Sequence, residues 1–157
     1  MRTILRSLFT LLLLTGLAAF GAQAALAGDA EPEPLRVVIE PVGNQLLFEQ
    51  DELSVEAGQQ VTIVFKNTAT SPAMEHNVIV LNDNSDATIN RVGQAALSAA
   101  ANEYIPEDDA VLAATPLAKP GDTVEVTFTA PSEPGQYSYI CTFPGHYAMM
   151  RGTMTVK

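Results

Sequence analysis

Three residues whose side chains bind soft metals lie close together in the last part of the sequence. Cys141, His146 and Met150 offer a thiolate, an imidazole and a thioether at the spacing Cys-x4-His-x3-Met. The chain of 157 residues has one cysteine and two histidines, and its other histidine, His76, lies far upstream. One thiolate, two imidazoles and a weak thioether form the ligand set of copper sites that transfer single electrons. We therefore interpret these four residues as ligands of one copper ion.

Each of these residues also has an ordinary structural explanation when it is taken alone. A lone cysteine at a strand end is usually a small buried hydrophobic residue, and a methionine such as Met150 usually belongs to the core. A single histidine near a turn is usually structural as well. The spacing within one loop favours the metal site, and so does the use of the only cysteine and both histidines. Soft sulfur suits Cu(I), and imidazole serves both oxidation states.

Short segments with alternating apolar residues must position these ligands. We expect strands at 35–40, 45–49, 53–56, 60–66, 76–81, 122–129, 136–141 and 152–157. A period of two residues, interrupted by Gly, Pro and Asn, predicts an all-β fold that is a β-sandwich or barrel. In such a fold the strand that begins at His76 and the loop after Cys141 can meet at one pole.

One segment follows a helical period instead. From about 88 to 101 the apolar residues recur at helical spacing, Asp86 can cap the start, and Pro106 lies beyond the end. We interpret this segment as a short helical insertion between strands. We expect it to cover one end of the sandwich as a lid, without a catalytic role.

Residues 1–27 have the layout of a secretory signal peptide. A start with two arginines precedes an apolar run over 8–20, and two A-x-A patterns predict cleavage near Ala24 or Ala27. The alternative is an uncleaved membrane anchor, but the apolar run is short for a span of about 20 residues. We therefore expect a periplasmic or otherwise exported protein. The sequence has no N-x-Ser/Thr sequon, which fits a bacterial source.

The chain beyond the signal is strongly acidic. Without the two arginines of the signal, six basic residues stand against 18 acidic ones, which gives a net charge of −12. We expect no binding to nucleic acid. The charge either steers the protein toward a basic patch on a partner or serves solubility alone. A proline-rich acidic lead over 28–34 should be extended, and the folded domain should occupy 35–157.

The ligand loop also resembles a known family. The sequence Cys-Thr-Phe-Pro-Gly-His at 141–146, with Met150 and the strand at 151–156, is similar to azurins and auracyanins, which are blue copper proteins of the cupredoxin family. The sequence Met-Glu-His-Asn at 74–77 and the turn at 106–109 match the same family. The resemblance covers most of the chain from Leu35 onward. It implies a cupredoxin-like Greek-key β-sandwich with a helical insertion.

The resemblance implies particular copper ligands. They are His76, Cys141 and His146, with Met150 as the distant axial ligand. Met149 is the competing thioether, one residue nearer to the histidine. Azurins have a glycine, whose carbonyl approaches the copper, where this chain has Glu75, so a contact from the Glu75 carbonyl is an open expectation. The chain also lacks the paired cysteines of many azurins and has no tryptophan.

The resemblance also implies roles for neighbouring residues. Asn77 should tie the His76 strand to the Cys141 loop through Thr142, and Phe143 should pack beside the copper and limit water. An apolar patch around the histidine of the Cys loop should dock redox partners. Its expected members are Met74, Pro144, Ala148 and Met149. The alternative is that the two methionines of this set are core residues.

These expectations favour a mobile, monomeric one-electron carrier rather than an enzyme. The expected partners are c-type cytochromes or membrane electron-transfer complexes, and a membrane tether is expected only if the N-terminal segment is uncleaved. The alternative is a copper chaperone or storage protein, which would favour exposed and exchangeable ligands. An enzyme would need a second metal centre or an open coordination position. With both histidines used, the chain cannot build a second centre from imidazoles.

Overall fold

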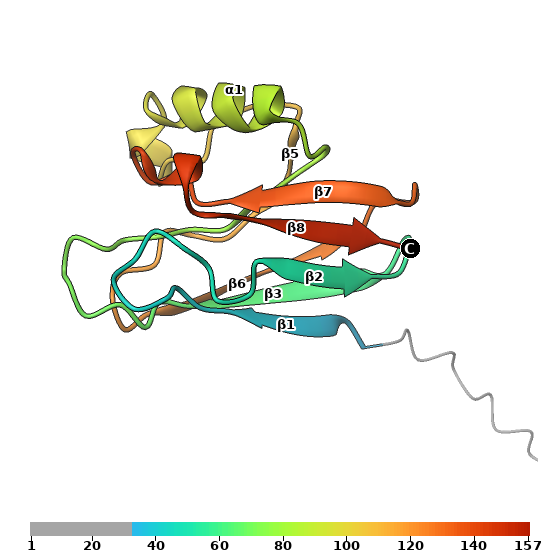
Figure 1. Ribbon diagram of the computed structural model, residues 1–157, viewed down its shortest axis with the longest axis horizontal. Helices are drawn as coiled ribbons and strands as arrows, with labels where there is room; N and C mark the ends of the chain where they lie inside the picture. The colour runs from blue at the N-terminus through green and yellow to red at the C-terminus, as the bar shows by residue number, and fades with distance from the viewer. Residues whose placement is uncertain (1–32) are drawn as a thin grey trace, which may run out of the picture. The chain divides into compact units, whose positions relative to one another are not determined.

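The described part of the chain, residues 33–157 of a computed structural model, consists of two β-sheets and one short helix (Figure 1). The expected signal peptide at 1–27 and most of the expected lead at 28–34 lie outside the described residues. The strands are β1 (Leu35–Ile39), β2 (Glu52–Val55), β3 (Gln60–Lys66), β4 (Ile79–Leu81), β5 (Val111–Ala114), β6 (Thr123–Thr129), β7 (Gly135–Ile140) and β8 (Arg151–Val156). One sheet has the order β1-β3-β6, and the other has the order β2-β8-β7-β4-β5. The predicted all-β sandwich is confirmed.

Both sheets are mixed. Strand β1 runs parallel to β3, and β2 runs parallel to β8, while the other neighbours are antiparallel. The alternating apolar residues of β3 and β6 lie opposite one another, as in the pairs Ile63 with Val126 and Phe65 with Val124. These residues and the inward side chains of β7 and β8 belong to the main core between the sheets. Hydrophobic burial of this kind is the dominant stabilising contribution in folding.

The structure corrects two expected strands and adds one. Segment 45–49 forms only an isolated bridge between Pro41 and Phe48, because the chain turns at Gly43, which has a positive φ. The strand expected from His76 is regular only in β4, and His76 itself forms an isolated bridge with Ala118. The N–H of Val78 donates to the hydroxyl of Thr115 and therefore forms no backbone hydrogen bond with a neighbouring strand. Strand β5 was not predicted, because its residues lack an alternating pattern.

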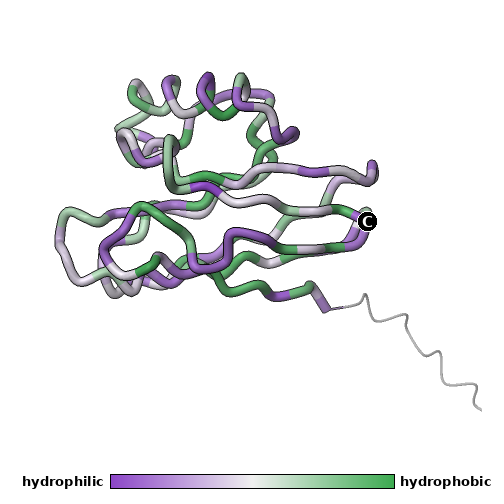
Figure 2. The backbone as a smooth tube through the Cα atoms, in the orientation of Figure 1, coloured by the Kyte–Doolittle hydropathy of each residue, from purple (hydrophilic) through white to green (hydrophobic). Residues whose placement is uncertain are grey.

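The helical insertion is α1 (Asp86–Ala96), followed by a 3-10 turn, η1 (Ala100–Asn102). Ser85, not Asp86, is the N-cap, since its hydroxyl accepts a hydrogen bond from the N–H of Thr88. Asp86 lies in the first turn, where its charge favours the helix dipole. Hydrophobic and hydrophilic residues alternate along α1 (Figure 2).

The apolar side of α1 packs on the outer face of the five-stranded sheet. Ile89 and Val92 form a second, smaller core with residues of β4 and β7, including Ile79, Leu81 and Ile140. The helix therefore covers a sheet face rather than one end of the sandwich. Within residues 33–157 no helix combines the length and the apolar composition that a membrane crossing requires.

Candidate metal centre

Three separate segments deliver the predicted donor residues. His76 precedes β4, Cys141 follows the last residue of β7, and His146 opens a short 3-10 turn, η2 (His146–Ala148). Between Cys141 and His146 the chain reverses at Gly145, whose φ of 83° lies in the left-handed region that favours glycine. The N–H of His146 donates to the carbonyl of Phe143 at 2.9 Å and closes this turn.

The structure brings His76, Cys141 and His146 together. The Cys141 Sγ lies 3.7 Å from the His76 Nδ1 and 3.6 Å from the His146 Nδ1, and the two Nδ1 atoms lie 3.2 Å apart. A circle through three points with these separations has a radius of about 2.0 Å, which is the length of a bond between a transition metal and an imidazole nitrogen. One metal ion therefore fits between the three atoms.

Burial prepares the two imidazoles to bind a metal. Cys141 and His76 have no exposed surface, and His146 is 7% exposed. Burial, with a smaller contribution from the charge of His146, lowers the pKa of His76 to about 4, and burial also lowers the pKa of His146. Both rings are therefore neutral near pH 7, and each can offer the lone pair that metal binding requires.

The thiol is held in its protonated form until a cation arrives. Burial raises the pKa of Cys141 to about 12, although the backbone N–H groups of Asn77 and Phe143 favour the thiolate. Metal binding at this sulfur must therefore release a proton, and the charge of the ion stabilises the thiolate.

Asn77 directly follows His76, and Thr142 directly follows Cys141. The two residues are hydrogen-bonded to each other and fully buried. The Asn77 Oδ1 accepts from the Thr142 N–H at 2.8 Å, and the Asn77 Nδ2 donates to the Thr142 Oγ1 at 3.0 Å. These bonds join two segments that are 65 residues apart in sequence. Hydrogen-bonded residues that lie next to metal ligands in this way orient those ligands.

Two carbonyls that sequence reasoning missed complete this network. The carbonyl of Glu103 accepts from the Asn77 Nδ2 at 3.1 Å, and the carbonyl of Tyr104 accepts from the Thr142 Oγ1 at 2.7 Å. Both acceptor residues have positive φ, 55° and 60°, which is uncommon outside glycine. No residue-type signal marks this turn, because Glu and Tyr do not favour the left-handed region.

Aromatic rings surround the histidines. The ring of Phe143 lies 4.9 Å from that of His146, and Tyr104 packs edge-on against Phe143 at 5.3 Å. Phe65 packs edge-on against His76 at 6.2 Å. Among residues 33–157, the His76 Nε2 is the buried side-chain nitrogen or oxygen that lacks a hydrogen-bond partner. These contacts leave the Nδ1 edges of the two rings facing the cysteine.

The two methionines of the loop lie in different environments. Met150 is fully buried in the same core as Cys141, and its carbonyl accepts from the Cys141 N–H at 2.9 Å. Met149 is 61% exposed. The other residues of the expected patch lie at or near the surface: Pro144 and Ala148 are exposed, and Met74 is half-buried. Glu75, directly before the first histidine, is also half-buried.

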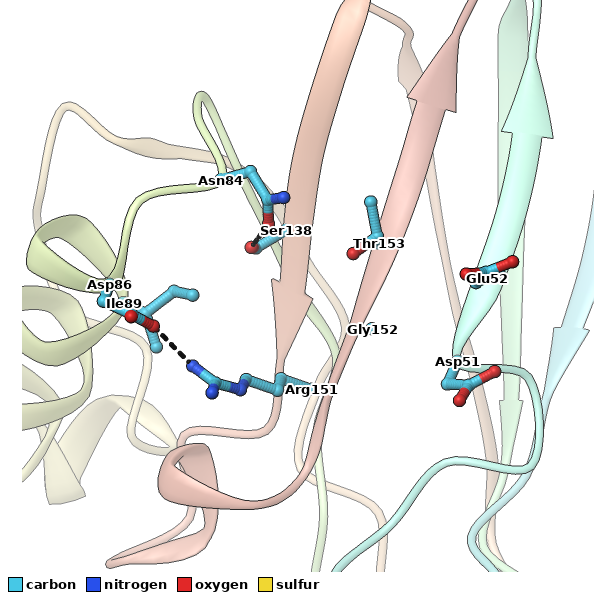
Figure 3. A pocket seen from close by; sticks show the side chains of 9 residues that line it. All are labelled: Asp51, Glu52, Asn84, Asp86, Ile89, Ser138, Arg151, Gly152 and Thr153. Atoms are coloured by element: carbon cyan, nitrogen blue, oxygen red, sulfur yellow. Dashed lines mark hydrogen bonds and ion pairs between the residues drawn. The ribbon is translucent and has the colours of Figure 1, made fainter.

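A pocket elsewhere on the molecule lacks these donors. It has a volume of about 390 Å³ and lies beside β7 and β8 (Figure 3). Its lining residues are Asp51, Glu52, Asn84, Asp86, Ile89, Ser138, Arg151, Gly152 and Thr153. It contains neither histidine nor cysteine, and Arg151 is paired with Asp86 across it. The three-donor cluster, not this pocket, is the candidate metal centre.

The whole folded region matches a known family. Residues 36–157 match the family described as copper binding proteins, plastocyanin/azurin family. The chain is 44% identical to auracyanin-A of Chloroflexus aurantiacus over 126 residues, which cover 79% of this chain and 75% of that protein. It is 37% identical to auracyanin-B of the same organism, of which it covers only 51%. It is 30% identical to azurin iso-2 of Methylomonas over 92% of that protein.

Solved structures agree with these relatives. The fold superposes on auracyanin A, described as a blue copper protein, with a TM-score of 0.73, covering 80% of this chain and 100% of that structure. It superposes on the azurin iso-2 of Methylomonas with a TM-score of 0.68 at 27% identity, covering 78% of this chain and 98% of that structure. The Greek-key cupredoxin architecture is thereby confirmed. The chain therefore belongs to the plastocyanin/azurin family of copper-binding proteins, whose blue copper members of the auracyanin and azurin type are electron carriers rather than enzymes.

Proposed function

We propose that this protein is an exported one-electron carrier in which His76, Cys141 and His146 bind one copper ion. The observation that carries the proposal is the triangle of their donor atoms, with edges of 3.2 to 3.7 Å. Bound copper would accept and release one electron as it alternates between Cu(II) and Cu(I). The role of the protein is to hold the donors in one arrangement through both states, which keeps reorganisation small.

Met150 is the proposed axial ligand, and its burial supports this choice over Met149. A thioether inside the core beside Cys141 can face an ion held by the three strong donors, whereas a side chain that is 61% exposed faces solvent. The N–H of Met150 also donates to the carbonyl of His146 at 2.8 Å, which fixes it relative to the histidine. A contact from the carbonyl of Glu75 is a further proposal, supported by its position directly before His76.

An electron carrier fits the enclosed site better than a copper chaperone or storage protein does. Both histidines and the cysteine are buried, and the Asn77–Thr142 pair joins their segments. A protein that delivers copper needs ligands that a second protein can reach and replace. Here only His146 has measurable exposure, and Phe143 covers its ring.

The proposed route for electrons runs through His146. The residues beside it in sequence, Pro144, Ala148 and Met149, are exposed and uncharged. Exposed apolar residues of this kind suit the small, weak encounters of electron-transfer partners. We propose c-type cytochromes or membrane electron-transfer complexes as the partners, with the protein acting as a monomer. Export is supported by the signal-like segment at 1–27.

The test is the spectrum of the purified protein after addition of Cu(II). We expect an intense blue band from charge transfer between thiolate and copper, and a narrow copper hyperfine splitting in the electron paramagnetic resonance spectrum. Both should disappear on reduction and return on oxidation without loss of copper. The variant Cys141→Ser should lack the band. A pale wild-type spectrum would contradict the proposed site, and release of copper on reduction would favour a chaperone.

A further inference from the structure

Helix α1 contains a glycine in its interior, where glycine is unfavourable. Gly93 is buried, and a Cβ built on it would overlap the ring of Tyr147 at Cγ, Cδ1 and Cδ2. The aromatic ring therefore lies directly against the helix backbone, at a place where any larger residue would displace it. This close approach explains why the helix has glycine at this position.

Tyr147 belongs to the ligand loop. It directly follows His146 in η2, and the carbonyl of His146 accepts hydrogen bonds from Met149 and Met150 at 3.0 and 2.8 Å around it. The histidine faces the main core with Cys141, whereas the tyrosine ring packs on the second core under α1. Figure 1 shows this turn, just before β8, close to α1. The two side chains thus anchor one short turn to two different parts of the molecule.

A second contact between α1 and the loop lies on the other side of Met150. Arg151 donates to Asp86, in the first turn of the helix, at 2.8 Å (Figure 3). The two side chains are 45% and 80% exposed, so this ion pair contributes little. The packing of the half-buried Tyr147 ring on the buried Gly93 is therefore the contact that can fix the loop.

We propose that Tyr147 is a positioning residue whose ring, packed on Gly93, holds the turn that carries His146 and Met150 in place relative to Cys141. The inference rests on the proposed function of these residues as copper ligands. It assigns the helical insertion a role in setting the spectrum and reduction potential of the centre. The helix would act on the copper only through the loop, since it supplies no ligand.

The test compares variants on the two sides of this contact. Gly93→Ala should push the ring away, shift the charge-transfer band and the reduction potential, and weaken copper affinity by about tenfold, as changes around metal ligands typically do. Tyr147→Leu, which keeps apolar bulk but not the flat ring, should also shift the band and the potential and weaken copper affinity. Tyr147→Phe should behave as wild type, because it retains the ring. The measurements are the absorption spectrum, the potential and competition with a Cu(I) chelator.

Ala95→Gly is the matched control. Ala95 is exposed on the same helix, so this change weakens the helix without touching the loop. It should lower the melting temperature and leave the spectrum and potential unchanged. The double variant Gly93→Ala/Tyr147→Leu should be no more perturbed than Tyr147→Leu alone, because the two residues act through one contact.

The outcomes separate this inference from the proposed function. If Gly93→Ala and Tyr147→Leu lower only the melting temperature and keep the wild-type spectrum, potential and affinity, the contact is structural and the inference is wrong. If Tyr147→Phe is as perturbed as Tyr147→Leu, the ring is not what positions the loop. If wild-type protein itself shows no thiolate–copper band, the proposed function fails before the variants are compared.

Discussion

Two regions of this molecule are built in opposite ways. The β3–β6 pair joins Gln60–Lys66 to Thr123–Thr129 in an unbroken antiparallel register, with apolar residues on one side. The ligand pole, which comprises residues 74–78, 103–104 and 141–150, has almost no regular strand. Its segments are joined by hydrogen bonds from side chains, and its buried residues include His76, Asn77, Thr142 and His146.

The difference shows where stability and function reside. The β3–β6 pair buries apolar side chains. This burial contributes about 25 cal/mol of stability per Å² of apolar surface removed from water, and it requires no specific partner atoms. The ligand pole buries polar groups, which is favourable only when each finds a partner. The His76 Nε2, which lacks a hydrogen-bond partner among the described residues, is an exception to this rule. Changes in the first region should affect folding alone, and changes to the buried polar residues of the second should affect the copper as well.

The largest expected effect is on folding, from Ile63→Ala in the β3–β6 pair. Ile63 is fully buried opposite Val126, so its truncation should lower the free energy of unfolding by about 3 kcal/mol. The copper spectrum of the folded protein should not change. Thr123→Ala, at an exposed position on β6, is the control and should stay within about 0.5 kcal/mol of wild type. An altered spectrum in Ile63→Ala would show that the two regions are not independent.

Acidification should weaken the ligand pole of the copper-free protein. The pKa of His76 is about 4 in the folded protein, below its ordinary value of 6.5, so the unfolded state binds its proton first. The contribution of His76 to the free energy of unfolding should therefore be complete above pH 6.5, and it should fall by about 3 kcal/mol as the pH decreases to 4. Urea denaturation of copper-free protein across this range measures the loss. The variant His76→Gln has no titrating group at this position, so its free energy of unfolding should depend less on pH. An equal pH dependence in both proteins would contradict the assignment of this effect to His76.

Asn77→Ala should have a mixed effect. It leaves the buried N–H of Thr142 and the carbonyl of Glu103 without their partner, which costs about 2 kcal/mol of stability. It should also shift the charge-transfer band and the potential, since the Cys141 loop loses its tie to the His76 segment. Thr62→Val removes the hydrogen bond to Thr127 in the β3–β6 pair and is the matched control. If both variants keep the wild-type spectrum, Asn77 does not orient the ligands.

The same contrast explains what the sequence could predict. The alternation in β3, β6 and β8 is a repeated signal, so residue types alone predict an all-β sandwich or barrel, and the structure shows the sandwich. The ligand types were also visible, because the chain has so few histidines and cysteines. The structure then placed His76, Cys141 and His146 together, which no local pattern in the sequence could establish.

Other features of the ligand pole depend on contacts between distant segments. The left-handed turn at Glu103 and Tyr104 exists because its two carbonyls have partners in Asn77 and Thr142, not because of the residues in the turn. The strand expected at His76 begins later for a similar reason, since Val78 bonds to the side chain of Thr115. Local propensity cannot indicate such contacts, so errors concentrate where the fold serves the metal.

The smallest structural effect is expected from Met149→Lys, at the surface of the ligand pole. Met149 is 61% exposed, whereas its neighbour Met150 is fully buried. The added charge should leave stability within about 0.5 kcal/mol of wild type and the copper spectrum unchanged. It should nevertheless slow electron exchange with a redox partner, because a charge would enter the proposed apolar docking surface beside His146 and require desolvation on contact. Stopped-flow oxidation by a c-type cytochrome measures this rate, with Leu112→Lys, at an exposed position on β5 beside Glu133, as control. Equal rates for Met149→Lys and wild type would remove this face as the docking surface, while leaving the copper site itself intact.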